Sequence, residues 1–168
     1  MVRQWIRAAG RPAAAILLTV FLLAGCSGTV SSPRITETDV KALLDDVEKA
    51  TLNRDVDGVV RHLAPFVVIT LIMNTPEKQG IVQLTRDQYR SELEKAHALI
   101  VQHEYRRDHS VITVRDDGRE ATAEAEVRER IVLRDREMRT ITRERAVLEI
   151  IDGKLMVTVL EGLVRPDH

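Results

Sequence analysis

The spacing of apolar residues changes along the chain, and each change predicts a different kind of structure. Over residues 36–52 apolar side chains recur every three or four positions, which predicts an amphipathic helix. Thr36 and Asp39 approximate a capping box at its start. The same spacing predicts a short second helix over 56–63. Pro65 ends it, because proline disfavours helical backbone in the residue before it.

The next stretch alternates between strand and helix signals. The continuous apolar run 66–73 is rich in β-branched residues and too short to cross a membrane, so it predicts a buried strand. A turn-rich loop follows, and residues 81–84 predict a short returning strand. A third helix is expected over 85–101, with a capping box made by Thr85 and Gln88.

From residue 102 onward the apolar period becomes two, which is typical of half-buried strands. Asp-Gly pairs at 117–118 and 152–153 separate alternating segments, and this dipeptide is a strong hairpin signal. We therefore expect an antiparallel meander of four strands. Their predicted ranges are 102–115, 119–134, 137–151 and 154–164.

The first residues follow a different pattern. Arg3, Arg7 and Arg11 give a positive start, and the apolar run 13–23 is too short to span a hydrocarbon core of about 30 Å as a helix. This arrangement fits a secretory signal. The run ends in Leu23-Ala24-Gly25-Cys26, a tetrad that resembles the lipobox of bacterial lipoproteins.

The lipobox resemblance implies that Cys26 receives a diacylglycerol and that the peptide bond before it is cut. The expected organisation is then a signal peptide over 1–25, the lipidated cysteine and a flexible tether over 26–34, a folded domain over 35–164 and a tail over 165–168. Ser27, in place of the aspartate that favours inner-membrane retention in that family, predicts the periplasmic face of the outer membrane. An uncleaved anchor helix, or an ordinary cleavage site beside a chance cysteine, stays an alternative.

Composition narrows the function further. The chain has a formal net charge of −1 and only two Phe, two Tyr and one Trp, so its core must be aliphatic. A nucleic-acid-binding protein would show a basic face and stacking aromatics, and neither is present in the sequence. A single cysteine cannot form an internal disulfide. No metal-ligand spacing or cofactor motif is apparent, so we expect no metal and no cofactor.

The order of elements resembles the NTF2-like (cystatin-like) superfamily, of the SnoaL and ketosteroid-isomerase type. The resemblance rests on the helix ending at 50–52 with the following 53–60, on the helix start at 84–89 and on the closing strand pair around 148–155. It implies an α+β fold in which three N-terminal helices pack on a curved antiparallel sheet around a cone-shaped cavity. That superfamily contains isomerases, dehydratases and non-catalytic binding modules, and the fold alone does not choose among them.

Hairpin turns fix the register of the strands, and the register fixes which side chains share a face. Two-residue turns at 135–136 and 152–153 would place Arg134 opposite Glu137, and would bring Glu129, Glu144 and Glu161 together on the apolar face. Burial and mutual repulsion raise the pKa of at least one such carboxyl. The three glutamates are therefore candidate catalytic acids or bases.

The first hairpin leaves two registers open. A three-residue loop at 116–118 puts Tyr105 opposite Glu129, whereas a two-residue turn puts Arg106 there. In the first register three further polar side chains share the inner face: His103, Arg107 and His109. Tyr105, His103 and Arg107 are thus candidate pocket residues, while His97 is expected at the surface. In a competing interpretation the glutamates pair with Arg106, Arg107 or His62 at a wet sheet edge, or a bulge turns them outward.

We favour a lipid-anchored envelope protein that acts without catalysis and binds a small apolar or amphipathic ligand or a partner protein. One alternative is an isomerase or dehydratase that uses a pocket glutamate as acid or base. Another is a structural dimer or assembly module that pairs through the outer face of the sheet with a second copy or an envelope protein. Charged positions such as Glu126 and Arg128 on that face predict a polar interface.

Overall fold

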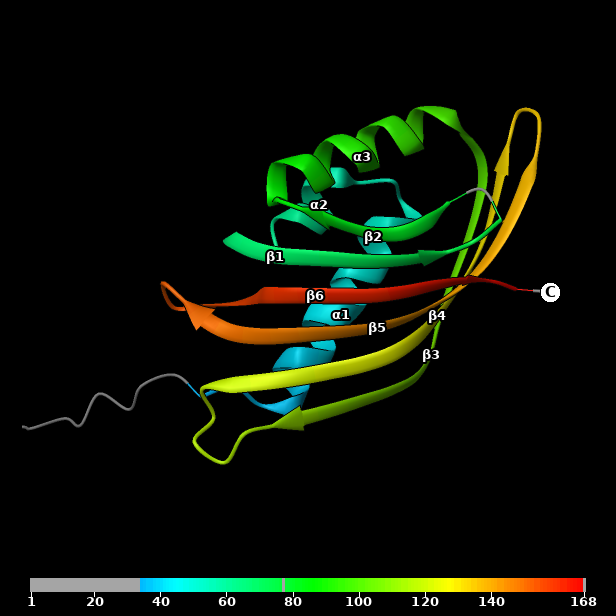
Figure 1. Cartoon of the computed structure of the whole chain (residues 1–168). Coiled ribbons are helices and arrows are strands. Elements are labelled where there is room, and N and C mark those ends of the chain that lie inside the picture. Colours follow the sequence, from blue (N-terminus) through cyan, green and yellow to red (C-terminus); the bar gives the residue numbers. More distant parts are fainter. Residues whose placement is uncertain (1–33, 77, 168) are drawn as a thin grey trace, which may run out of the picture. The chain divides into compact units, whose positions relative to one another are not determined.

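The computed structural model describes residues 34–76 and 78–167, and the predicted lipobox lies outside these ranges. The order of elements follows the prediction closely (Figure 1). In the described ranges these elements are α1 (Glu37–Leu52), α2 (Val56–Val60), β1 (Leu63–Asn74), β2 (Gln79–Leu84), α3 (Arg86–Leu99), β3 (Ile100–Val114), β4 (Glu120–Leu133), β5 (Glu137–Ile151) and β6 (Lys154–Pro166).

Both long helices begin at the predicted capping boxes. At α1 the Thr36 hydroxyl accepts from the Asp39 amide at 3.2 Å, and the Asp39 carboxylate accepts from the Thr36 amide at 3.0 Å. At α3 the Thr85 hydroxyl accepts from the Gln88 amide at 3.3 Å, and the Gln88 side chain accepts from the Thr85 amide at 2.9 Å. Each box satisfies two backbone donors that a helix start leaves without partners.

The sheet is mixed, which corrects the expectation of an antiparallel sheet. Its order in the described residues is β2-β1-β6-β5-β4-β3, and β1 runs parallel to β6 while every other neighbouring pair is antiparallel. The expected meander of β3 to β6 is confirmed. The three helices do not all precede the sheet, because α3 lies between β2 and β3 in the chain. This α3 crossover joins the β1–β2 hairpin to the far edge of the sheet (Figure 1).

Strand β1 differs from its prediction in two ways. It begins at Leu63 rather than after Pro65, and the proline falls where the pairing with β6 is irregular, a place that tolerates a missing amide donor. The strand is also not buried on both faces. Val67 and Ile69 point into the core, whereas Phe66 is exposed on the outer face.

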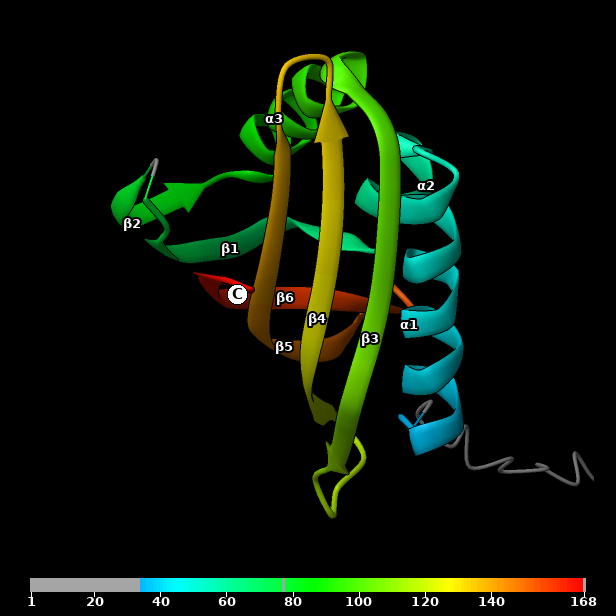
Figure 2. The same ribbon diagram turned by 90° about the vertical axis from the view of Figure 1, so that its right-hand side faces the viewer.

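The core lies between the helices and the inner face of the curved sheet (Figure 2). Val40 of α1, Ile69 of β1, Val127 of β4 and Leu148 of β5 are among its fully buried side chains. They come from four different elements of both layers. Packing of apolar residues from both layers therefore holds the helices against the sheet.

Two β-bulges reverse the in-and-out alternation partway along a strand. In β3 the register shifts between Asp108 and Val111, and His109 takes a positive φ of 50° there. In β6 the register shifts at Thr158, so that Val157 pairs with Leu148 but Val159 pairs with Val147. Because the side-chain period of a strand is two, each residue after the bulge lies on the face opposite to the one that unbroken alternation along the strand would give it.

The β4–β5 register also differs from the prediction, with less effect. Glu137 pairs with Val132 rather than with Arg134, so the connecting turn is longer than two residues. This shift is an even number of positions. Each side chain of β4 and β5 therefore keeps its predicted face.

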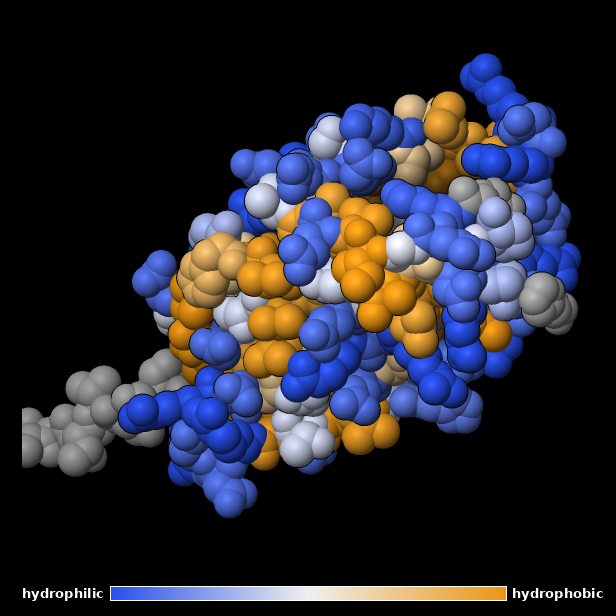
Figure 3. Space-filling model, viewed as in Figure 1, coloured by the Kyte–Doolittle hydropathy of each residue, from blue (hydrophilic) through white to orange (hydrophobic). Residues whose placement is uncertain are grey.

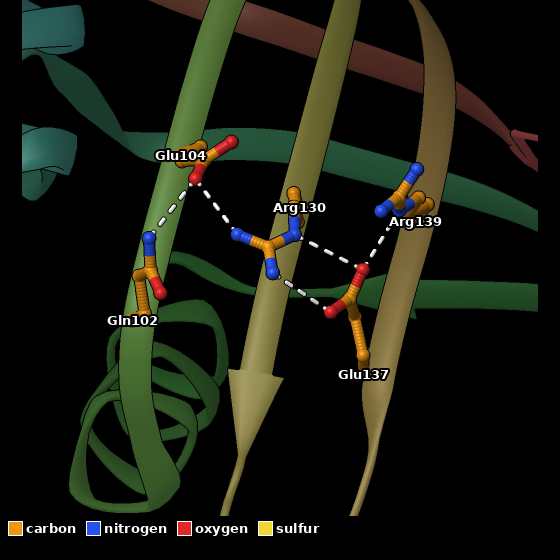
Figure 4. Close-up of polar contacts among 5 residues, drawn as sticks. All are labelled: Gln102, Glu104, Arg130, Glu137 and Arg139. Atoms are coloured by element: carbon orange, nitrogen blue, oxygen red, sulfur yellow. Dashed lines mark hydrogen bonds and ion pairs between the residues drawn. The ribbon is translucent and has the colours of Figure 1, made fainter.

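The outer face of β3, β4 and β5 carries a cluster of ion pairs, as predicted for a charged, solvated face (Figure 4). Arg130 donates to both Glu137 carboxylate oxygens, at 3.0 and 2.8 Å, and to Glu104 at 2.8 Å. Arg139 donates to Glu137 at 2.8 Å. Hydrogen bonds from the two guanidinium groups lower the pKa of Glu137 to about 2, and Arg130 contributes more than Arg139.

The β1–β2 side of the same outer face is apolar, which the sequence interpretation missed. Phe66 is 61% exposed and Ile81 is 69% exposed, and Val68 and Ile72 are exposed between them. Hydrophobic side chains accordingly gather over the middle of the face seen in Figure 3. The bulge in β6 adds Leu163 to this area, because it pairs with outward-facing Ile72.

Candidate functional site

A cavity of about 240 Å³ lies between α1, α3 and the inner face of β3 to β6. Most of its lining is aliphatic, with representatives from each layer: Leu43 and Val47 of α1, Leu93 of α3, Ala125 and Ile131 of β4 and Leu160 of β6. The small alanines of β4 face the helices and leave room that larger side chains would fill. An enclosed, largely apolar space with few polar groups is the usual form of a small-molecule site.

The inner faces of β4 and β5 bring two carboxyl groups into this cavity. Glu129 lies opposite Tyr105 of β3 and Thr140 of β5, and Glu144 lies opposite Ala125 of β4. Both glutamates line the cavity, as the sequence interpretation placed them. Each follows the alternation that buries the alanines and valine of β4 and Ala146 of β5 on the same face.

Glu129 is paired with a histidine. The Nε2 atom of His103 lies 2.9 Å from a Glu129 carboxylate oxygen, and the His103 side chain is only 5% exposed. Donation from Nε2–H to the carboxylate leaves Nδ1 as the other ring nitrogen. Within the described residues Nδ1 of His103 is buried and has no hydrogen-bond partner. The cavity therefore presents a polar atom that a ligand can satisfy.

Glu144 is different, because the described part of the chain gives its carboxyl no hydrogen-bond partner. The pKa of Glu144 is raised to about 7, first by burial and second by the charge of Glu129, while Arg107 acts in the opposite direction. The group is thus divided between its neutral and ionised forms near neutral pH. A carboxyl in this state can both give and take a proton.

The arginine that lines the cavity, Arg107, already has partners. Arg107 is 8% exposed, and its guanidinium lies 3.1 Å from a Glu48 carboxylate oxygen of α1. It also donates to the Leu44 carbonyl at 2.8 Å and to the Tyr105 hydroxyl at 3.4 Å. The charge of Arg107 is therefore largely compensated by α1 rather than by the pocket glutamates.

Two phenols complete the polar lining. Burial raises the pKa of Tyr89 and of Tyr105, and the charges of Glu144 and Glu129 add to the effect on both. Both hydroxyls consequently stay protonated at any physiological pH. They are neutral groups that can donate or accept a hydrogen bond inside the cavity.

The structure does not bring Glu161 to this site, which corrects the prediction. The bulge at Thr158 pairs Glu161 with Arg145 instead of Glu144 and turns it to the outer face. There its carboxylate lies 3.2 Å from Arg145 Nη1, in an exposed ion pair. The same shift places Gly162 opposite Glu144.

The predicted inner position of His109 is wrong as well, because the bulge in β3 leaves this side chain exposed. Of the two open registers, the one with Tyr105 opposite Glu129 is correct, and Arg106 lies opposite Arg128. His103, Tyr105 and Arg107 all line the cavity. Their role in ligand binding stays a prediction.

Sequence reasoning missed two residues that line the cavity, His97 and Tyr89, and missed Glu48 as the partner of Arg107. His97 was expected at the surface, yet it lines the cavity, and its Nδ1 atom is buried without a partner among the described residues. Its position four residues after Leu93 on the predicted stripe of α3 was the available signal. Tyr89 begins the same stripe. Glu48 gave no signal, because its helix position looked like part of a solvated face.

Two further features concern the part of the chain that the structure describes. Residues 34–76 and 78–167 contain no group of three or more His, Cys, Asp or Glu side chains placed to hold a metal ion. None of the helices in these ranges combines the length and the hydrophobicity needed for a membrane span.

Solved structures show which fold this is. A protein from Pseudomonas putida, described as NTF2-like and of unknown function, superposes with a TM-score of 0.63 at 15% identity, covering 78% of this chain and 87% of that one. A Nostoc punctiforme protein of unknown function with a cystatin-like fold gives 0.58 at 16% identity, covering 80% and 97%. The chain therefore has the NTF2-like fold, as the resemblance implied.

The similarity does not extend to a function. A ketosteroid isomerase-like protein from Erwinia carotovora superposes with a TM-score of 0.58 at 10% identity, covering 77% of this chain and 96% of that one. Some matched structures carry isomerase or dehydratase names, and others are described as of unknown function. No protein-family model matches the sequence, and comparison with curated proteins finds no match either.

Proposed function

We propose that this domain is a non-catalytic binding module for a small amphipathic ligand. The observation that carries the proposal is the cavity itself, which is mostly aliphatic and has Glu129, Glu144 and His103 among its polar lining residues. The apolar lining supplies the binding energy, at about 25 cal/mol for each Å² of apolar surface removed from water. The polar groups fix the ligand's orientation.

Filling the cavity tests this function. Ala125→Phe and Leu93→Phe each place an aromatic ring in the space, so either change should abolish saturable binding of the neutral fluorescent probe N-phenyl-1-naphthylamine. Ala42→Phe on the exposed side of α1 is the control and should bind as the wild type does. Circular dichroism confirms that each variant is folded. Unchanged binding by both folded cavity variants would show that the probe binds elsewhere and would remove the basis of the proposal.

Acid–base catalysis is the second candidate, and the state of Glu144 favours it. A carboxyl with a pKa near 7 inside an apolar cavity, close to two neutral phenols, has the properties of a general acid or base. An isomerase or dehydratase of this kind would exchange a carbon-bound hydrogen of its ligand with solvent. Mass spectrometry of a bound ligand in D₂O should then show deuterium uptake with the wild type and none with Glu144→Gln.

The predicted location adds a membrane to this function. We propose that the mature protein is attached to the bacterial envelope through lipidated Cys26, at the outer membrane because Ser27 follows it. Two or more acyl chains anchor a protein stably, whereas one does not. Cys26→Ser should move the protein from the detergent phase to the aqueous phase and should prevent labelling with radioactive palmitate. Retention in the detergent phase would refute the lipid anchor.

The apolar area on the outer face supports a second copy of the chain, or an envelope protein, as a partner. Phe66→Glu and Ile81→Lys should lower the mass measured by sedimentation equilibrium if copies pair there. Val111→Lys is a matched control, since Val111 is an equally exposed residue on the charged side of the sheet. If the wild type is monomeric, a second copy is excluded as the partner and an envelope protein remains.

A further inference from the structure

The lining of the cavity carries more negative than positive charge that is free to meet a ligand. Two carboxyl groups, Glu129 and Glu144, line it. Arg107 lines it too, but its guanidinium is held at 3.1 Å by Glu48 and at 2.8 Å by the Leu44 carbonyl, both on α1. The charge of Arg107 is therefore balanced mainly by groups of α1, and Glu144 has no ion-pair partner among the described residues.

The other titratable groups around Glu144 are neutral or paired. Helix α3 contributes Tyr89 and His97; the first stays protonated, and burial lowers the pKa of the second, which favours neutral imidazole. Strand β3 contributes Tyr105 and His103, and the latter pairs with Glu129 of β4. No group in this set of lining residues is a cation available to an incoming anion.

We propose, resting on the function above, that the polar end of the ligand is an amine, bound as an ammonium ion by Glu144 with Glu129 close by. A buried ionised group requires a partner of opposite charge, and Glu144 is the carboxyl in this cavity that lacks one. An ammonium ion supplies that partner. A carboxylate or phosphate end would instead lie against two like charges in an apolar space.

The amine also fixes the direction of the pH dependence. An ammonium ion pairs with the ionised form of Glu144, and a proton competes for the same site as the pH falls. Binding of an amine should therefore tighten between pH 6 and pH 8. Binding of an alcohol with the same apolar body should change little, because a hydroxyl can accept from the protonated carboxyl or donate to the ionised one.

A matched series of probes tests the proposal on the full chain. The three probes share a naphthalene ring and end in a methylamine, a hydroxymethyl or a carboxylate group, and titration calorimetry measures their dissociation constants at pH 6 and pH 8. At pH 8 the amine should bind at least about 10-fold more tightly than the carboxylate. Glu144→Gln should weaken the amine about 10-fold while leaving the alcohol within about 2-fold. Glu161→Gln, the same change on the outer face, should alter none of these values.

The outcomes separate this inference from the function on which it rests. If the alcohol binds but the carboxylate binds as tightly as the amine, the amine proposal is wrong and the binding function stands. The amine proposal is also wrong, and the binding function also stands, if folded Glu144→Gln still binds the amine more tightly than the carboxylate by the wild-type ratio. Circular dichroism shows whether this variant is folded. If none of the three probes binds, the binding function fails, and the amine proposal fails with it.

Discussion

Replacing Glu144 with glutamine should stabilise the protein at alkaline pH and leave it unchanged at acid pH. The folded-state pKa of Glu144 is about 7, above the value of 4.5 for an unperturbed glutamate. The folded state therefore holds a proton between these two pH values that the unfolded state has released. Stability from this group is fully present below about pH 4.5 and is lost as the pH rises to about 7. Glutamine is neutral at every pH and avoids this loss.

The size of the effect follows from the shift. Each pKa unit corresponds to about 1.4 kcal/mol, so the displacement of Glu144 from 4.5 to about 7 amounts to about 3–4 kcal/mol of unfolding free energy above pH 7. Glu144→Gln should therefore raise the unfolding free energy at pH 8 by about 3–4 kcal/mol relative to the wild type. At pH 4.5 the two proteins should agree within about 0.5 kcal/mol, because both side chains are then neutral.

Equilibrium urea unfolding followed by circular dichroism measures this difference across the pH range. Fluorescence is less suitable, since the one tryptophan, Trp5, lies in the predicted signal segment. Glu161→Gln is the matched control and should change stability little at either pH, because its exposed ion pair with Arg145 is of the kind that contributes about 0–1 kcal/mol. A Glu144→Gln effect that is the same at pH 4.5 and pH 8 would refute the argument.

Three other substitutions test the packing around the site, each by urea unfolding at pH 7. Arg107→Met should lower the unfolding free energy by about 2–3 kcal/mol, because it leaves the partly buried Glu48 carboxylate unpaired; a loss below 1 kcal/mol would show that water replaces the guanidinium. Thr85→Ala should cost about 1 kcal/mol by removing one half of a capping box, and no loss would mean that water caps α3. Gly58→Ala should cost about 1–3 kcal/mol, since its Cβ would lie 2.8 Å from Ala50 Cβ; a neutral result would mean that α2 moves aside.

The sequence predicts much of this fold because its local signals agree with the tertiary structure. Thr36 and Thr85 start helices where capping boxes predict them, and Asp-Gly at 152–153 makes a tight turn with both residues at positive φ. The parallel contact of β1 with β6 is not encoded locally. It joins segments about 90 positions apart, and no residue pattern of either strand states the direction of its neighbour.

Site prediction succeeded and failed for identifiable reasons. Glu129 and Glu144 lie on strands without bulges between them, so a register error of two positions left their faces unchanged. Glu161 lies beyond the bulge at Thr158, and the valines and leucines around it give no sequence signal for a bulge. His97 was missed because histidine suits a surface and a cavity equally well, and only the helical stripe of α3 distinguishes the two.

The bulge at Thr158 also bears on how a protein with this fold can change over evolutionary time. Deleting that one residue would leave Leu148 opposite Val157 and Val147 opposite Val159, so the pairing of β5 and β6 would become continuous and every side chain from Val159 to Arg165 would keep its face. Glu161 would stay opposite Arg145, and Gly162 would stay opposite Glu144. The bulge therefore lets β6 gain or lose a single codon at this position while the cavity and the outer surface keep the same side chains.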